Sequence, residues 1–250
     1  MEKSVSHIAP YIDHTILKPT TTLSAARTVC NEALTYGFAA VCIPPPLVRQ
    51  AKVWLHGDEN GGASGAMLAA IDTHPAADGT TASRPPVKVA TVIGFPFGYS
   101  ACRAKKMEAE QALSDGADEL DVVINLMALK NGDTHTLERE MLSITEAAHA
   151  KGKIVKVIIE SGILSDEEII RCCTIYSKIG VDFLKTSTGY AERGATVEAV
   201  RLMRQNLPSH IRIKASGGIR TLDFARELIA AGADRLGCSA SVEIVKAELS

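Results

Sequence analysis

The residues IGVDFLK at positions 179–185 join the end of a predicted helix to a short apolar strand, and their pattern decides the fold. Three other stretches share it: YGFAAVC at 36–42, DGADELD at 115–121 and AGADRLG at 231–237. In each stretch a glycine suits the left-handed cap that ends a helix, and a strand follows. The sequence therefore predicts a repeated helix–strand unit.

The repeat also aligns four positions. The fifth residue after each glycine is Cys42, Asp121, Lys185 or Gly237. Because these residues follow a helix cap at the same distance, we expect them at equivalent depths near the carboxyl ends of their strands. Barrel enzymes place their chemistry at those ends.

Four more apolar stretches complete a set of eight strands, at residues 11–13, 87–93, 154–159 and 211–215. Asp121 and Lys185 are 64 residues apart, and Lys185 and Gly237 are 52 apart. Each interval has room for two strand–helix units of about 26 to 32 residues. Strict alternation of apolar strands with helices predicts a parallel sheet, and eight units favour a closed (β/α)8 TIM barrel, with residues 1–250 as one domain.

One segment breaks the alternation. Residues 57–86 are rich in glycine and proline, and we expect an excursion between the second helix and the third strand. It is expected on the amino-terminal side of the barrel, away from the site, or alternatively as an oligomer contact.

The composition excludes several classes of protein. The 250 residues are 46% hydrophobic and 22% charged with a formal net charge of -2, so no nucleic-acid partner is predicted. Neither a signal-peptide core nor a membrane-spanning apolar run is present in the sequence, which favours a cytoplasmic protein. The six cysteines lack zinc or disulfide spacing and are interpreted as reduced thiols.

Lys185 is the first candidate for chemistry. It ends an apolar run, and a buried ammonium costs several kcal/mol unless it is paired or loses its proton. A lysine made neutral by its surroundings is a nucleophile for carbonyl carbon. The alternative is a strand-end lysine whose amine reaches solvent.

Neighbouring strands supply partners for this lysine. If Lys185 faces the barrel interior, alternation turns Lys214 inward on the next strand, and repulsion between the two ammonium ions favours a neutral Lys185. Alternation also turns Asp121, Val123 and Asn125 inward together. The carboxylate and the second amine would form a proton relay. Alternatively, Asp121 is a structural ion-pair partner and Lys214 is solvated.

Two glycine turns predict a phosphate site. SGGIR at 216–220 follows the seventh strand and GCS at 237–239 follows the eighth, the two loops on which barrels often bind phosphate. Tight strand–helix turns also use such glycines, which is the alternative explanation. Cys42 has no neighbouring base and is interpreted as part of the pocket lining.

Several motifs together resemble the deoxyribose-phosphate aldolases: FLKTSTG at 183–189, KASGGIRT at 214–221, ELDVVIN at 119–125, DHT at 13–15 and AVCIP at 40–44. The resemblance runs from about residue 12 to about residue 241. It implies a (β/α)8 barrel, deoxynucleoside catabolism, and reversible cleavage of 2-deoxy-D-ribose 5-phosphate to acetaldehyde and D-glyceraldehyde 3-phosphate. Phosphosugar and aldehyde substrates are implied, without a metal or another cofactor, and a homo-oligomer is compatible with it.

The resemblance also assigns roles to residues. Lys185 would form the Schiff base, and Asp121 and Lys214 would donate and accept protons. The substrate-binding residues would be Asp13, Thr15 and Thr186 near the reacting carbons, and Gly189, Gly217, Gly218, Gly237 and Ser239 around the phosphate. Where some relatives have a lysine and a second serine, this chain has Tyr190 and Ala240, which predicts a less cationic phosphate site.

Two other functions remain open from the residues. A phosphosugar isomerase or synthase barrel would use Asp121 as base and Lys214 as acid without a covalent intermediate. A non-catalytic phosphosugar-binding barrel should lack one of the proton carriers, yet Asp121, Lys185 and Lys214 are all present.

Overall fold

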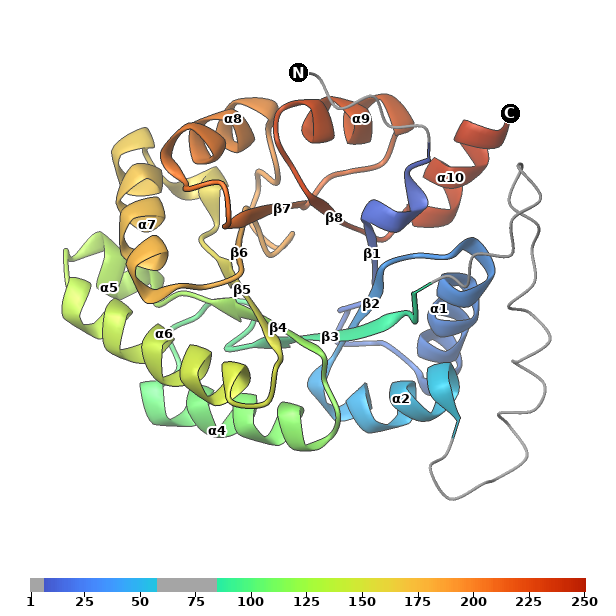
Figure 1. Ribbon diagram of the computed structural model, residues 1–250, viewed down its shortest axis with the longest axis horizontal. Coiled ribbons are helices and arrows are strands. Elements are labelled where there is room, and N and C mark those ends of the chain that lie inside the picture. Colours follow the sequence, from blue (N-terminus) through green and yellow to red (C-terminus); the bar gives the residue numbers. More distant parts are fainter. Residues whose placement is uncertain (1–6, 58–84) are drawn as a thin grey trace.

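The computed structural model describes residues 7–57 and 85–250. Eight parallel strands pair in chain order and close into a barrel, and the helices form a ring around it (Figure 1). This confirms the predicted TIM barrel. The strands are β1 (Ile12–Thr15), β2 (Ala40–Ile43), β3 (Lys88–Ile93), β4 (Glu119–Val123), β5 (Ile154–Ile158), β6 (Phe183–Lys185), β7 (Arg212–Ser216) and β8 (Arg235–Cys238).

In the described residues, each strand is followed by at least one helix. The α-helices are α1 (Leu23–Tyr36), α2 (Val48–His56), α4 (Cys102–Ser114), α5 (Leu126–Lys130), α6 (Thr134–His149), α7 (Asp166–Ile179), α8 (Val197–Asn206), α9 (Leu222–Ala230) and α10 (Ser241–Leu249). Short 3-10 helices are η1 (Ala9–Tyr11), η2 (Pro45–Leu47) and η3 (Ser161–Ile163). Tyr11, expected in the first strand, belongs to η1.

The repeated glycines act as predicted. Gly37 and Gly180 are the left-handed C-caps of α1 and α7, with φ of 70° and 78°. Gly116 and Gly232 lie one residue beyond the caps of α4 and α9 and also have positive φ, 100° and 118°. The four repeats therefore lead into β2, β4, β6 and β8, the alternate strands of the barrel.

Strand alternation divides the core into two regions. Leu184, Ile213 and Ala215 face outward into the large apolar core under the helices. Ala40, Cys42, Ala90 and Val92 form a separate small cluster. Lys214 lies between Ile213 and Ala215 in β7, so it faces the barrel interior, as the alternation predicts.

Two other predictions have different outcomes. Asn125 does not continue β4 inward: the strand ends at Val123, and the Asn125 side chain caps α5 by accepting the Ala128 N–H at 3.0 Å. Within the excursion predicted at 57–86, residues 58–84 lie outside the described residues, so its position stays a prediction. Among the helices that are described, none is long and apolar enough to cross a membrane.

Candidate active site

A buried cluster of charges fills the interior of the barrel around Asp121. Its Oδ2 accepts hydrogen bonds from Nζ of Lys185 and of Lys214, each at 2.7 Å, and its Oδ1 accepts one from Lys156 Nζ at 2.9 Å. Asp121 and Lys214 are fully buried, and Lys185 is 3% exposed. The three residues predicted to act together therefore meet at one carboxylate.

Strand register explains this meeting. Lys185 of β6 pairs directly with Lys214 of β7, and Asp121 of β4 pairs with Lys156 of β5. Paired residues on neighbouring parallel strands point to the same side of the sheet. Closure of the barrel then brings the two pairs within hydrogen-bonding distance.

Three members of the cluster were missed from the sequence. Lys156 bonds the Glu119 carboxylate as well as Asp121, and the Arg235 guanidinium bonds both Asp13 and Glu119. A signal for Lys156 existed, because it interrupts an apolar strand just as Lys185 ends one. Glu119 lies two residues before Asp121, so alternation turns it inward too.

Asp13 and Thr186 lie beneath the cavity instead of lining it. The Asp13 carboxylate is fully buried, forms an ion pair with Lys214 Nζ at 2.5 Å and accepts a hydrogen bond from Arg235 Nε at 2.7 Å. The Thr186 hydroxyl donates to the Ser216 carbonyl at 3.1 Å and accepts its N–H at 3.0 Å. Both residues therefore support others that face the cavity.

The charges of the cluster do not affect its lysines equally. Burial lowers the pKa of Lys185; Asp121 opposes this shift and Lys214 adds to it. Burial also disfavours the Lys214 ammonium, but the Asp121 and Asp13 carboxylates outweigh it and raise the pKa of Lys214. Lys185 is therefore the amine most readily neutral, and Lys214 remains cationic.

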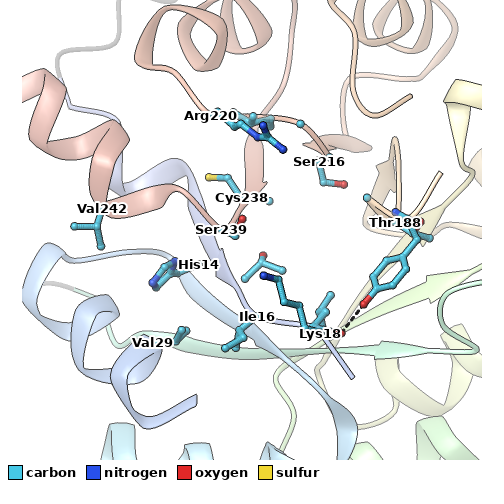
Figure 2. Close-up of a pocket in the computed structure, with 18 of the residues that line it drawn as sticks. His14, Ile16, Lys18, Val29, Thr188, Ser216, Arg220, Cys238, Ser239 and Val242 are labelled. Atoms are coloured by element: carbon cyan, nitrogen blue, oxygen red, sulfur yellow. Dashed lines mark hydrogen bonds between the residues drawn. The ribbon is translucent and has the colours of Figure 1, made fainter. Parts of the chain in front are cut away.

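A cavity of about 1100 Å³ opens above this cluster, with Lys185 in its wall. Figure 2 shows side chains from the loops after β1, β6, β7 and β8 surrounding it. The predicted residues that line the cavity are Thr15, Lys185, Gly189, Gly217, Gly218, Gly237 and Ser239. Cys42, predicted as pocket lining, is fully buried below, and burial raises the pKa of its thiol.

Two positions at the cavity, Gly217 after β7 and Gly237 within β8, have no room for a larger residue. Gly217 has φ of 88°, and a Cβ there would lie 3.0 Å from the Cα of Gly194. At Gly237 a Cβ would lie 2.9 Å from the Ser216 Cβ and 3.0 Å from the Lys214 Cε. The turn after β7 can therefore bring backbone N–H groups close to a ligand. Gly237, which belongs to β8 and not to the turn predicted after it, leaves room for the Ser216 and Lys214 side chains.

Tyr190 links two loops of the cavity, and positive charge comes from other residues. The Tyr190 hydroxyl donates to the Leu17 carbonyl at 2.9 Å, joining the loops after β6 and β1 (dashed line in Figure 2). Besides Lys185, the cations that line the cavity are Lys18, Arg220 and Lys246. None of these three makes an ion pair within the described part of the chain. These side chains come from separate loops and a helix, and Glu32 and Glu243 also line the cavity, so a phosphate site less cationic than that of some relatives stays a prediction.

His14 is a further cavity residue that the sequence reasoning did not single out. Its Nδ1 bonds the Ser241 hydroxyl at 2.9 Å, and its Nε2 bonds Glu32 Oε2 at 2.7 Å. Its ring packs against Phe38 at 5.1 Å between centroids. His14 therefore joins α1 and α10 at the cavity wall.

Comparisons with known proteins agree with this geometry. The sequence profile of the DeoC/LacD family aldolases matches residues 7–244. A deoxyribose-phosphate aldolase from Thermococcus gammatolerans is 45% identical over 239 residues, covering 96% of this chain and 95% of that protein. One from Bacillus cereus is 43% identical over 239 residues, with 96% and 95% covered. A tetrameric deoxyribose phosphate aldolase from Aeropyrum pernix superposes with a TM-score of 0.79 at 29% identity, covering 97% of this chain and 91% of that one.

The fold and these matches define a class I aldolase, a carbon–carbon lyase built on a (β/α)8 barrel. Within that class, the chain belongs to the DeoC/LacD aldolase family.

Proposed function

We propose that this enzyme catalyses the reversible aldol cleavage of 2-deoxy-D-ribose 5-phosphate to acetaldehyde and D-glyceraldehyde 3-phosphate, a step of deoxynucleoside catabolism. The observation that carries the proposal is the Lys185 amine, which lies in the cavity wall 2.7 Å from a buried carboxylate and has a lowered pKa. The relatives that match nearly the whole chain carry the name of this activity.

In the proposed mechanism, neutral Lys185 attacks the aldehyde carbon of the open-chain sugar. Loss of water gives an iminium ion that withdraws electrons. As a base takes the proton of the hydroxyl at C3, the bond between C2 and C3 breaks, releasing D-glyceraldehyde 3-phosphate and leaving an enamine. Protonation of the enamine carbon and addition of water then release acetaldehyde and restore the amine.

We assign the proton transfers to Asp121 and Lys214. Their 2.7 Å contact and the 2.7 Å contact between Asp121 and Lys185 connect the three groups. Lys214 lies below the cavity and not in its wall, so the transfer to substrate carbon runs through a water in this scheme. Lys156, which also contacts Asp121, holds that carboxylate in place.

We assign the phosphate to the turns after β6, β7 and β8. Gly189, Gly217, Gly218, Gly237 and Ser239 would supply backbone and hydroxyl donors. Arg220 and Lys18 would supply positive charge, because both line the cavity without a carboxylate partner in the described residues. Thr15 would contact the sugar chain between the two ends of the site.

We further propose that residues 1–250 act as one catalytic barrel, that the enzyme works in the cytoplasm and that it forms a homo-oligomer. The six cysteines are free thiols, which fits a reducing compartment. The Aeropyrum pernix relative is tetrameric, which supports an oligomer.

Borohydride reduction in the presence of acetaldehyde tests the covalent mechanism. We expect an ethyl adduct on Lys185, found by mass spectrometry of peptides, and loss of cleavage in step with its formation. Lys52→Met is a matched control, because Lys52 pairs with Asp118 outside the cluster. Continued cleavage of deoxyribose phosphate without an adduct would favour the non-covalent isomerase or synthase mechanism, which the comparisons do not favour.

A further inference from the structure

Glu160 has an unusual backbone for its residue type. Its φ of 57° is the only positive φ of a non-glycine residue in the described ranges. It lies between the end of β5 and η3, and it is 3% exposed. Side chains with a Cβ adopt this left-handed conformation at a cost in free energy, so surrounding contacts must hold it.

The kink at Glu160 changes the pairing between β5 and the loop after β6. The Ile159 N–H donates to the Lys185 carbonyl at 3.0 Å, and the Ser161 N–H donates to the Thr186 carbonyl at 2.8 Å. In a regular parallel ladder the second bond would reach the Ser187 carbonyl, because donors and acceptors both advance by two residues. The left-handed residue therefore shifts the pairing by one residue.

This shift has a consequence for the turn after β7. The Ser187 carbonyl is left to accept the Ser216 hydroxyl, at 2.6 Å. Ser216 lines the cavity directly before Gly217 and Gly218. The kink at Glu160 is thus connected to the Gly217–Gly218 turn through the Ser187 carbonyl group.

The Glu160 side chain also fixes the turn after β6 that contains Gly189. Its carboxylate accepts the Thr188 N–H, at 3.2 and 3.3 Å to its two oxygens, and the Thr188 hydroxyl. The Thr188 hydroxyl oxygen in turn accepts the Tyr190 N–H at 3.0 Å. Between these two bonded N–H groups, the Gly189 N–H has no acceptor within the described residues.

The carboxylate occupies the place where an anion could bind Thr188. Its two oxygens take both donors of that residue, so the turn offers the ligand only the donor at Gly189, which lines the cavity with φ of 86°. The mechanism itself leaves Glu160 unused, because no proton transfer passes through it. Burial raises the pKa of this carboxyl, and its bonds with Thr188 and the charge of Lys185 oppose that shift.

We propose that Glu160 is a positioning residue for the phosphate subsite: it orders the turns after β6 and β7 so that the Gly189 and Gly217 backbone faces the phosphate group of the substrate. This rests on the function proposed above. It predicts that Glu160 controls binding of the phosphorylated substrate and is not needed for attack by Lys185.

The test compares two measurements in Glu160→Gln: KM for the phosphorylated substrate, and the rate of Lys185 labelling by a probe without phosphate. An amide cannot accept from both Thr188 donors with the strength of a carboxylate, so KM for 2-deoxy-D-ribose 5-phosphate should rise about tenfold. The rate at which acetaldehyde and borohydride label Lys185 should not fall, since this probe has no phosphate and loss of the Glu160 charge can only favour the neutral amine. An unchanged KM, or labelling that falls as much as kcat/KM, would overturn the proposal.

Two further variants separate positioning from stability. Asn tolerates the left-handed backbone but is too short to reach Thr188, so Glu160→Asn should raise KM at least as much as Glu160→Gln, while the relieved backbone offsets part of the stability lost with the Thr188 bonds. Glu140→Gln is a matched control, because Glu140 is a buried carboxylate paired with Lys105 and lies outside the cavity. It should lower the thermal midpoint without changing KM.

The same measurements separate failure of this proposal from failure of the proposed function. If Lys185 of the unmodified enzyme is not labelled, the Schiff-base function is wrong. If it is labelled and KM is the same in Glu160→Gln, Glu160→Asn and the parent enzyme, only the role of Glu160 is wrong. A rise of KM in Glu140→Gln equal to that in Glu160→Gln would also overturn it.

Discussion

Replacing Lys214 with methionine should make Lys185 harder to deprotonate. Both amines lie 2.7 Å from the same oxygen of Asp121, so their nitrogens are at most twice that distance apart. At an effective dielectric constant of about 20, two unit charges about 5 Å apart repel by about 3 kcal/mol. Methionine has a similar shape without the charge, so this repulsion disappears.

The sign follows from the charge of the protonated amine. Lys214 disfavours the Lys185 ammonium, and its removal stabilises that form, so the pKa of Lys185 rises by about two units. Asp13 and Asp121 also lose a cationic partner, which acts in the same direction. At a pH below both pKa values, the nucleophilic fraction of Lys185 then falls about a hundredfold.

The assay is the rate of borohydride labelling of Lys185 by acetaldehyde, measured as a function of pH. We expect the pH at which labelling reaches half its maximum to move about two units to the alkaline side in Lys214→Met. Lys52→Met should leave the midpoint unchanged, because its amine bonds Asp118 outside the cluster. A midpoint in Lys214→Met equal to that of the parent enzyme would refute the electrostatic activation of Lys185.

Three other perturbations have defined outcomes. Arg220→Gln should raise KM for the phosphorylated sugar about tenfold while acetaldehyde labelling is unchanged, and an unaltered KM would contradict its phosphate role. Burial alone would raise the pKa of the Asp118 carboxyl. A backbone N–H and two lysines outweigh burial and lower this pKa from 3.8 to about 2. Asp118→Asn should therefore lower the free energy of unfolding by about 2 kcal/mol near neutral pH, and the difference should vanish as pH falls through about 2; urea titrations that show a constant difference would disagree. Gly237→Ala places a Cβ 3.0 Å from the Lys214 Cε, so kcat should fall about tenfold or more, and an unchanged kcat would show that this amine can move freely.

Local sequence rules were sufficient for part of the site. A fixed offset from a helix-ending glycine placed Asp121 and Lys185 at related depths, and alternation then placed Lys214 beside them. These rules depend only on the geometry of one strand and its preceding helix. They could therefore be applied before any long-range contact was known.

Contacts across the barrel were not accessible in the same way. Arg235 bonds Glu119, from which it is separated by 116 residues, and only closure of the sheet brings the two together. The left-handed backbone of Glu160 also had no local signal, because glycine, asparagine and aspartate are the residues usually expected in that conformation. Both features depend on the assembled barrel.

Charge balance explains why Lys185, among the amines of the Asp121 cluster, is the one suited to attack a carbonyl. Asp13, Glu119 and Asp121 face Lys156, Lys214 and Arg235, so three carboxylates already match three cations. Lys185 is a fourth basic group and contacts only Asp121, whereas Lys156 and Lys214 each contact at least two carboxylates.

The amine with the weakest support is therefore the one whose pKa is lowered, and it is also the one in the cavity wall. When the proposed iminium ion forms, positive charge returns to the Lys185 nitrogen, at a position 2.7 Å from Asp121. The carboxylate then attracts the covalent intermediate more strongly than the neutral amine. An interaction that is weak in the starting state and strengthens along the reaction lowers the barrier.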